Sequence, residues 1–582
     1  MEQAVALANN DVVLLAWSYN AKIADCLGFA IYRLDDGERN PLPAWVGFHG
    51  EDNPDWDPST TEHWPVQKFS WRDLTASRGG TYSYEVVPMT GSPGDLAPLE
   101  DRALTTNQVT LTPVRSENVR AYFNRGILST QALAHKLPHD AAGGPSSEAL
   151  LAHIRTPGDE IRMSLAGQII EALGLLPRRA DEENGRAQAA LYELNDPELV
   201  GLLLDPDHVS LVLSNAGEGA RRDSTNADAR RRLHDEQVDI TDRMLGSGHI
   251  GHDKFTVYLT AAGSPRAVQT GSTNWTSTGL CAQANNAIVL TSEALAGAYL
   301  DFWNRLRAEC PVDPADGGTQ SPALRSTNQE RSAQSIADPW TIDGARVSLC
   351  LSPNTPQQAK PSHDPPRPTD MAEVFELIAA AQKGVLFLLF QPGSPSVLDA
   401  ILEAQVANPE LFVRGAATDP KAIENYDTTL FHRTGDHPEV AAAAVLDHAF
   451  GYWQKELLKS SPSAHAVIHD KIVVIDPTSD DDCVVVTGSH NLGYRASYAN
   501  DENLLIIKGH RPLAEAYATH VMDIYDHYRW RWRQKHPDPG DPAPAGDDVG
   551  FGLATDGGWQ SKYFDDPEAA AERLFWLAGA GG

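Results

Sequence analysis

The stretches Gly251-His252-Asp253-Lys254-Phe255 and Ile468-His469-Asp470-Lys471-Ile472 repeat one pattern in distant parts of the chain. Each is followed by a glycine-serine-x-asparagine sequence, Gly271-Ser272-Thr273-Asn274 in the first copy and Gly488-Ser489-His490-Asn491 in the second. The spacing from histidine to glycine is 19 residues in both copies. A lone histidine on a strand is usually a core residue, whereas two such copies at one spacing indicate a site built by two similar halves.

The histidine and lysine of each copy open an apolar stretch suited to a β-strand. Side chains alternate between the two faces of a strand, so the two residues share one face. The serine and asparagine of each GSxN are also two residues apart, which lets them point into the same pocket. The glycine allows close approach of the backbone to a bound group. The sequence therefore predicts one cationic pocket at a pseudo-twofold axis.

Such a pocket suits a phosphate group. One histidine attacks phosphorus while the other protonates the leaving oxygen, and lysines and asparagines stabilise charge on the non-bridging oxygens. Because these donors supply the charge stabilisation, we expect neither a metal nor a cofactor. The predicted catalytic residues are His252, Lys254, Asn274, His469, Lys471 and Asn491, and the predicted substrate-binding residues are Gly271, Ser272, Gly488 and Ser489.

On these motifs the chain resembles the phospholipase D superfamily, whose signature is HxKx4D followed by GSxN, present twice per active site. The second copy fits fully and includes Asp476, whereas the first has Leu259 where the aspartate would fall. The resemblance covers roughly residues 114–535. It implies a bilobal α/β fold and phosphodiesterase activity through a covalent phosphohistidine.

The two halves differ after GSxN. The second half has Asn500-Asp501-Glu502-Asn503, and the aligned stretch of the first half, Gln283-Ala284-Asn285-Asn286, lacks a carboxylate. Superfamily members place a carboxylate here against the catalytic histidine. We therefore expect Glu502 to contact His469, raise its pKa and make it the general acid, which leaves His252 as the nucleophile. The neutral partner in the first half also resembles the tyrosyl-DNA phosphodiesterase branch.

The chain is expected to fold as two α/β halves preceded by a small β-sandwich. Short β-rich runs occupy the N-terminal part, in which Trp17 and the run from Tyr82 to Val86 resemble a fibronectin type III domain. Farther on, strands alternate with helices, which is typical of mixed sheets covered by helices. The predicted parts are a sandwich at 1–112, a first half at 113–310, a linker at 311–342, a second half at 343–536 and a C-terminal tail at 537–582.

Composition excludes several classes of protein. The chain has 582 residues, a 41% apolar share and a net charge of −32, which fits a globular protein and disfavours non-specific binding to nucleic acid. No apolar run approaches the ~18 residues that span a bilayer, and the start lacks the features of a secretory signal. Five scattered cysteines show no CxxC spacing, which disfavours disulfides and structural zinc. A cytoplasmic location is expected.

The favoured substrate is a glycerophospholipid at a membrane surface, hydrolysed or transferred to an alcohol. The rivals are a nuclease or nucleic-acid end-processing enzyme, cardiolipin synthase-like transfer, and a non-catalytic scaffold that binds phosphate groups. Arginines between Arg221 and Arg232 offer the basic patch that a nucleic acid would need. The stretches Phe123–Gly126 and Tyr192–Pro197 are also similar to those of bacterial superfamily members, without an assigned role. The sequence leaves the oligomeric state open.

Overall fold

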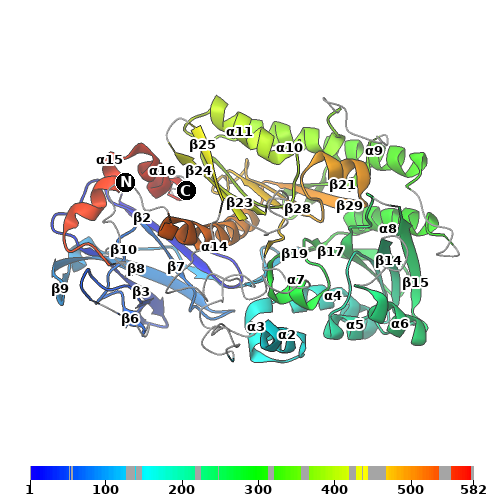
Figure 1. The fold of residues 1–582 in the computed structure, drawn as a ribbon, viewed down its shortest axis with the longest axis horizontal. Coiled ribbons are helices and arrows are strands. Elements are labelled where there is room, and N and C mark those ends of the chain that lie inside the picture. The colour runs from blue at the N-terminus through cyan, green and yellow to red at the C-terminus, as the bar shows by residue number, and fades with distance from the viewer. Residues whose placement is uncertain are drawn as a thin grey trace. The chain divides into compact units, whose positions relative to one another are not determined.

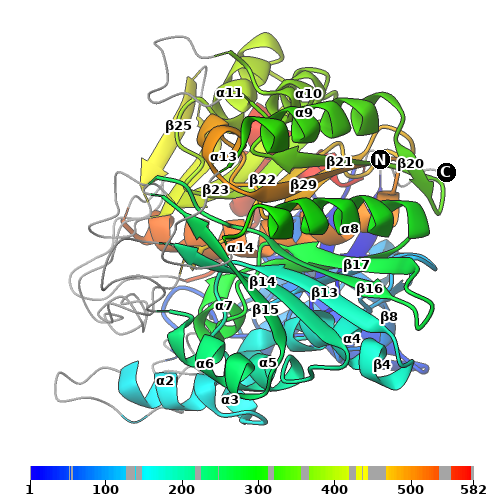
Figure 2. The same ribbon diagram turned by 90° about the vertical axis from the view of Figure 1, so that its right-hand side faces the viewer.

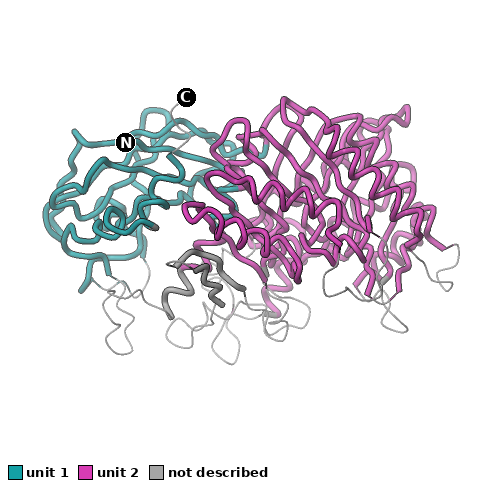
Figure 3. The backbone as a smooth tube through the Cα atoms, turned by 90° about the horizontal axis from the view of Figure 1, so that it is seen from above, with its two compact units in different colours: residues 1–113, 518–523, 533–582 teal, residues 114–517, 524–532 magenta. Residues whose placement is uncertain are grey.

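The computed structural model describes residues 2–51, 53, 57–125, 138, 147–216, 225–246, 248–311, 320–355, 366–418, 428–434, 437–442, 467–535 and 552–577. The chain divides into two compact units, which Figure 3 colours separately. The first unit holds residues 1–113, 518–523 and 533–582, and the second holds residues 114–517 and 524–532. Segments from both ends of the chain therefore belong to the first unit.

The first unit is built on antiparallel sheets (Figure 1). One sheet has the order β1-β2-β7 and another the order β10-β8-β3-β4, with β9 and β11 also paired to β8; β5 pairs with β6. The elements are β1 (Gln3–Ala8), β2 (Val13–Ser18), β3 (Gly28–Asp35), β4 (Glu38–Pro41), β5 (Pro43–Ala44), β6 (Ser59–Thr60), β7 (Ser70–Asp73), β8 (Thr81–Ser92), β9 (Asp95–Pro98), η1 (Glu100–Arg102), β10 (Leu104–Thr105) and β11 (Val109–Thr110). This is the expected all-β module. Its resemblance to fibronectin type III domains stays a prediction.

The C-terminal segment completes the core of this module instead of forming a separate tail. Its elements are η5 (Gly557–Gln560), α15 (Ser561–Asp565) and α16 (Pro567–Phe575). The ring of Trp559 lies 5.8 Å from that of Phe29 and 5.7 Å from that of Phe69. Trp17, fully buried, lies 5.3 Å from Phe29 on the other side of the cluster. The aromatic residues of the segment supply apolar area that the sandwich alone lacks.

The first half of the second unit is a seven-stranded mixed sheet of order β12-β19-β17-β16-β13-β14-β15. Strands β13, β14 and β15 run parallel, and the other neighbours run antiparallel. The elements are β12 (Val119–Phe123), α2 (Ser147–Arg155), α3 (Glu160–Ala166), α4 (Ile169–Glu182), β13 (Arg186–Leu191), α5 (Pro197–Leu202), β14 (Val209–Ala216), α6 (Ala227–Asp235), β15 (Asp239–Leu245), β16 (Lys254–Leu259), β17 (Pro265–Gly271), α7 (Ser277–Cys281), β18 (Gln283–Ala284), β19 (Asn286–Thr291) and α8 (Glu293–Ala308).

Helices cover both faces of this sheet. On β16, Phe255 packs against Phe302 of α8 at 6.0 Å, whereas Tyr258 belongs to the core that α4 covers. Residues 255 and 258 point to opposite faces because side chains alternate along a strand. Figure 2 shows α8 and α4 on the two sides of the sheet. The HxK residues at the start of β16 are thus carried by a fully covered central strand.

The second half repeats this plan in a nine-stranded sheet of order β20-β21-β29-β28-β27-β22-β23-β24-β25. Its central strands β29-β28-β27-β22-β23 correspond to β19-β17-β16-β13-β14. The elements are α9 (Pro322–Ala337), β20 (Trp340–Ile342), β21 (Ala345–Ser352), α10 (Thr369–Ala379), β22 (Gly384–Phe390), α11 (Val397–Ala407), β23 (Phe412–Thr418), β24 (Thr428–Thr434), β25 (His437–Ala442), β26 (Val467–Ile468), β27 (Ile472–Ile475), β28 (Val484–Gly488), α13 (Tyr494–Ala499), β29 (Glu502–Lys508) and α14 (Arg511–Lys535). The prediction of two similar α/β halves with mixed sheets is confirmed.

The expected linker at 311–342 is wrong for its described part, which contains α9 and β20. Polar composition suggested a linker, but α9 packs on β21 through small polar side chains. The hydroxyl oxygens of Ser332 and Ser335 accept hydrogen bonds from the backbone N–H groups of Leu351 and Leu349 at 2.9 and 2.7 Å. Both serines are buried. None of the helices in the described ranges is long and apolar enough to cross a membrane.

Candidate active site

The two halves of the second unit exchange backbone hydrogen bonds at the start of each HxK motif. The N–H of His252 donates to the carbonyl of Asp501 at 2.9 Å, and the N–H of His469 donates to the carbonyl of Ala284 at 3.0 Å. Asp501 and Ala284 both lie in the segment that follows GSxN in the opposite half. Each histidine is therefore positioned by the other half of the unit.

These contacts bring the two histidines together, as the repeat predicts. The ring centroids of His252 and His469 lie 6.4 Å apart with an interplanar angle of 68°. Lys254 and Lys471 are buried beside them. Two imidazoles at this separation leave room between them for a tetrahedral group, and the lysines place positive charge at the same site.

Each histidine contacts the partner that was expected for the other histidine. Nδ1 of His252 lies 3.2 Å from Oε1 of Glu502, and Nδ1 of His469 lies 2.9 Å from Oδ1 of Asn285. The expected contact between Glu502 and His469 is wrong, because each histidine pairs with the segment after the opposite GSxN. The carboxylate therefore stands behind His252 and the neutral amide behind His469.

The contacts at Nδ1 favour a proton on that atom in both rings: Nδ1 of His469 is hydrogen-bonded to Oδ1 of Asn285, and Nδ1 of His252 lies 3.2 Å from Oε1 of Glu502. Nδ2 of Asn285 donates to the carbonyl of Gly279 at 2.9 Å, so Oδ1 faces His469 and accepts. Although burial opposes its charge, contact with His252 lowers the pKa of Glu502, so at pH 7 this carboxylate only accepts. In each ring Nε2 is left for chemistry in the pocket.

Burial and the neighbouring lysines make both histidines neutral in the free protein. Burial, followed by Lys254, lowers the pKa of His252 to about 4 although Glu502 opposes this shift. The same two kinds of cause, burial and the charge of Lys471, hold the pKa of His469 well below its ordinary value. Burial also lowers the pKa of Lys254 to about 8. A bound phosphate would reverse part of these shifts, because its negative charge favours the protonated forms.

An aromatic ring stands beside each histidine–lysine pair. Tyr192 at the end of β13 lies 4.9 Å from the ring of His252, and Nζ of Lys254 lies 5.1 Å from the ring of Tyr192. In the second half Phe390, at the end of β22, takes the same position at 4.6 Å from His469 and 4.9 Å from Nζ of Lys471. These rings restrict the side chains to one orientation and wall the pocket.

The serines and glycines of GSxN hold the backbone around the site. The hydroxyl oxygen of Ser272 accepts a hydrogen bond from the backbone N–H of Asn286, and that of Ser489 accepts one from the backbone N–H of Asn503, both at 3.0 Å. Each asparagine directly follows a histidine partner in the sequence. The Ser272 hydroxyl donates to Oδ1 of Asn285 at 2.8 Å. Both hydroxyl groups are fully buried with protein partners. Their predicted role in substrate binding stays a prediction, and their observed role is to position the histidine partners.

The glycines permit a close backbone approach. Gly271 and Gly488 have φ of +148° and +143°, and a Cβ at either would meet a backbone carbonyl oxygen, that of Asn286 or Asn503, at 2.3 or 2.4 Å. Only glycine fits both the angle and the contact. The glycines thus let β17 and β28 lie against the segments that carry the histidine partners.

The two asparagines of GSxN have different environments. Nδ2 of Asn274 donates to Oε2 of Glu193 at 2.6 Å, whereas the backbone N–H of Asn491 donates to Oε2 of Glu502 at 3.1 Å. Within the described residues, neither Oδ1 atom has a hydrogen-bond partner although both are buried. The sequence identified both asparagines but not Glu193, even though Glu193 lies in the noted stretch Tyr192–Pro197.

Two further pairs join the halves below the histidines and were missed from the sequence. Nδ2 of Asn286 donates to Oδ1 of Asp470 at 2.7 Å, and Nδ2 of Asn503 donates to Oδ1 of Asp253 at 2.9 Å. The sequence contains a signal for these pairs. The residue between histidine and lysine is aspartate in both motifs, and an asparagine follows the histidine partner in both halves. These pairs are buried and bind the halves to each other.

The aspartate of the HxKx4D signature is outside the pocket. Oδ1 of Asp476 accepts the backbone N–H groups of Lys383 and Gly384 at 2.7 and 2.8 Å, and Oδ2 accepts that of Gln382 at 2.9 Å. It fixes the turn before β22. Leu259 replaces it in the first half, where β16 and β17 shift register next to this residue. The missing aspartate therefore alters a turn and not the pocket.

The comparison with protein families matches the second half of the unit. The family model described as "Cardiolipin synthase, PLD-like domain" matches residues 374–525. This segment is thus similar to a PLD-like domain. It contains the second HxK and GSxN copy and Glu502, so half of the candidate site belongs to it. The comparison with curated proteins found no match.

Solved structures with some similarity include several proteins that act on phosphate esters. Phosphatidylserine synthase of Haemophilus influenzae Rd KW20 is 12% identical with a TM-score of 0.34, over 62% of this chain and 85% of that chain. Nuc of Salmonella typhimurium, a phospholipase D family member, is 20% identical with a TM-score of 0.19, over 24% of this chain and 87% of that chain. Yeast tyrosyl-DNA phosphodiesterase is 9% identical with a TM-score of 0.28, over 56% and 84% of the two chains.

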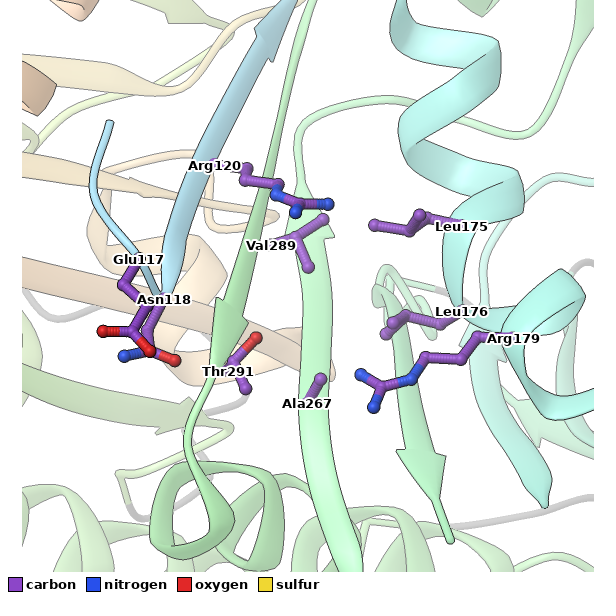
Figure 4. Close-up of a pocket in the computed structure, with 9 residues that line it drawn as sticks. All are labelled: Glu117, Asn118, Arg120, Leu175, Leu176, Arg179, Ala267, Val289 and Thr291. Carbon is purple, nitrogen blue, oxygen red and sulfur yellow. The ribbon is translucent and has the colours of Figure 1, made fainter. Parts of the chain in front are cut away.

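Two other features lie away from the PLD-like domain and the histidines. A cavity of about 240 Å³ on the first half is lined by Arg120, Arg179, Leu175, Val289 and five further residues (Figure 4). In the described part of the chain, ligand atoms of Asp181, Asp205 and His208 lie within 4.8 Å of one another, as a divalent cation would require. None of the predicted site residues belongs to either feature.

Proposed function

We propose that the protein is a phosphodiesterase of the phospholipase D type that works through a covalent phosphohistidine. The observation that carries the proposal is the 6.4 Å separation of the His252 and His469 rings, with Nδ1 of each facing a partner from the opposite half. The lysines and asparagines supply donors for the non-bridging oxygens, and the chemistry therefore has no need of a metal ion.

We assign the nucleophile to His252. When Nε2 of His252 bonds to phosphorus, the ring acquires a positive charge, and the Glu502 carboxylate 3.2 Å from Nδ1 stabilises it. As the P–N bond forms, the P–O bond to the leaving alcohol breaks, and Nε2–H of protonated His469 gives its proton to the leaving oxygen. The nucleophile and the acid are the residues expected from the sequence. The reason differs, because the carboxylate lies behind His252 and not behind His469.

His469 is suited to the acid role because its partner is neutral. Asn285 stabilises the imidazolium less than a carboxylate would, so protonated His469 is a stronger acid once the bound phosphate has favoured its protonation. In the second step neutral His469 takes a proton from water or an alcohol while that oxygen attacks phosphorus. The P–N bond then breaks, and its electron pair returns to Nε2 of His252.

The favoured substrate is a glycerophospholipid, and a nucleic acid is the alternative. The net charge of −32 disfavours a polyanion, and two arginines of the basic run are paired with acids: Arg231 contacts Asp228 at 2.7 Å, and Arg230 contacts Asp242. Arg221 and Arg222 lie outside the described residues. The neutral partner of His469 supports the alternative, because it resembles the tyrosyl-DNA phosphodiesterase branch.

Parallel assays with a chelator present test the proposal and choose between substrates. Purified protein is incubated with phosphatidylcholine vesicles containing ethanol and, separately, with single- and double-stranded DNA. Phosphatidylethanol as a product would support both the lipid substrate and a covalent intermediate that partitions between water and alcohol. Cleavage of DNA alone would favour the alternative. A soluble chromogenic diester turned over at the wild-type rate by both His252→Ala and His469→Ala would refute catalysis by these histidines.

A further inference from the structure

Glu193 is a carboxylate near the histidines that takes no part in the proposed phosphohistidine mechanism. Its segment is held against the first GSxN, because the backbone N–H of Trp275 donates to the carbonyl of Glu193 at 3.0 Å. Its side chain is fixed by the 2.6 Å hydrogen bond from Nδ2 of Asn274 to Oε2. Tyr192, the preceding residue, contacts His252. Glu193 therefore stands at the pocket wall in a defined orientation.

The second half places an uncharged residue at the matching position. Phe390 bears the same relation to His469 and Lys471 as Tyr192 bears to His252 and Lys254, and Gln391 follows Phe390 as Glu193 follows Tyr192. The second half therefore has no carboxylate at the matching position in sequence. The charge of Glu193 is the feature that calls for an explanation.

Glu193 faces the positive charges that would hold a phosphate. Burial raises the pKa of Glu193, and the charge of Lys254, the hydrogen bond from Asn274 and the charge of Lys471 oppose this shift by stabilising the carboxylate. The further charged and titratable groups around the two lysines are Glu502, Asp253, Asp470, His252 and His469, and Tyr192 adjoins Glu193 on the same strand end. Glu193 and Glu502 both place a carboxylate within electrostatic range of both lysines.

We propose that Glu193 is a specificity-determining residue that admits a singly charged phosphodiester and disfavours a doubly charged phosphomonoester. This inference rests on the proposed function of the same pocket. A diester carries one negative charge, whereas a monoester carries nearly two at pH 8 because its second pKa is about 6. The second charge is repelled by Glu193 or forces Glu193 to bind a proton. Monoester products and free phosphate are thereby kept from occupying the site.

The substitution Glu193→Gln removes the charge and keeps the contact, because Oε1 of glutamine accepts from Asn274 as the carboxylate did. Inhibition constants are measured at pH 8 for phenyl phosphate and for its methyl diester, against turnover of a chromogenic diester. One unit charge in such a pocket changes binding by about tenfold. Because the repulsion by Glu193 scales with the charge of the ligand, we expect the inhibition constant of phenyl phosphate to fall about 100-fold in the variant and that of the methyl diester to fall about tenfold.

The exposed Glu293 in the first turn of α8 provides the control, because Glu293→Gln removes the same charge far from the pocket. Equal changes for both inhibitors, or the same shift in Glu293→Gln, would overturn the inference. If Glu193→Gln does not fold, the inhibition constants of the wild type are compared at pH 8 and pH 5.5. Phenyl phosphate loses its second charge at the lower pH, so the ratio of its inhibition constant to that of the methyl diester should decrease. A constant ratio overturns the inference.

The inference and the proposed function fail in different ways. A wild type that hydrolyses diesters but shows no charge discrimination through Glu193 refutes only the inference. A wild type that hydrolyses no phosphodiester refutes the proposed function, and the binding of inorganic phosphate measured by calorimetry then shows whether Glu193 still acts on an anion in the pocket. Tighter phosphate binding by Glu193→Gln under those conditions would support a charge-selective phosphate site without catalysis.

Discussion

The carboxylate behind His252 makes a quantitative prediction for Glu502→Gln. Glu502 is fully buried, and its Oε1 lies 3.2 Å from Nδ1 of His252. Oε1 also accepts from Nδ2 of Asn500 at 2.6 Å, so the carbonyl oxygen of a glutamine would take this position and keep an acceptor for the ring. Its amide would then face the backbone N–H of Asn491. The substitution removes a negative charge and also the hydrogen bond from the backbone N–H of Asn491, because an amide nitrogen cannot accept it.

The magnitude follows from the charge that forms on His252. Two unit charges about 4 Å apart interact by about 4 kcal/mol at an effective dielectric constant near 20. The retained acceptor offsets part of this, and a loss of about 3 kcal/mol remains, which corresponds to about 10²-fold in the rate of phosphohistidine formation. Binding of the substrate involves no charge on His252, so KM should change by less than about threefold.

Quenched-flow measurement of the first turnover with a p-nitrophenyl phosphodiester is the assay. The control is Glu373→Gln, which removes a carboxylate paired with Lys508 at 2.5 Å in the same half but away from the histidines. A normal first turnover in Glu502→Gln, or an equal loss in the control, would refute the role given to Glu502. A loss confined to the second turnover would instead assign the nucleophile to His469.

Three further predictions concern the intermediate, pH and the C-terminal segment. A digest after acid-quenched turnover should carry the phosphoryl adduct on His252, and an adduct on His469 would reverse the two roles. Because the pKa of His252 is about 4 in the folded protein against 6.5 in the unfolded chain, the unfolded state binds its proton first as pH falls. Stability should therefore decline by about 2.5 kcal/mol from this group between pH 7 and pH 4.5, and urea denaturation of His252→Gln should lack that decline. Trp559→Ala should destabilise the first unit by about 2 kcal/mol in urea, while replacement of the exposed Trp45 should have little effect.

The repeat made the core of the site predictable from the sequence. Two HxK motifs with GSxN at one spacing can serve one phosphate only if their strands meet, and the structure brings His252 and His469 together. The repeat also predicted two similar α/β halves. The alternation of strands and helices located most elements because buried strands and amphipathic helices leave clear periodic patterns.

Partner choice was not predictable from one half considered alone. Glu502 and Asn285 follow their own GSxN in sequence, but the parallel pairing of β18 with β26 and the bridge between Gly251 and Asp501 deliver each to the opposite histidine. These are long-range backbone pairs without a local signal. The helix α9 was missed for a different reason, since four of its five buried side chains are polar and composition does not distinguish them from those of a loop.

The crossed arrangement explains how nearly symmetric halves produce chemically different histidines. His252 and His469 are 217 residues apart in sequence, as are Asn285 and Glu502 and the pair Asn286 and Asn503. The backbone hydrogen bond that each histidine donates to the opposite half has nearly the same length in both halves. The same holds for the buried asparagine–aspartate hydrogen bonds. The group behind each ring differs, a carboxylate for His252 and an amide for His469. Since each ring and its partner come from different halves, one substitution in either half changes the chemistry of the histidine supplied by the other, and neither half holds a complete nucleophile or a complete acid.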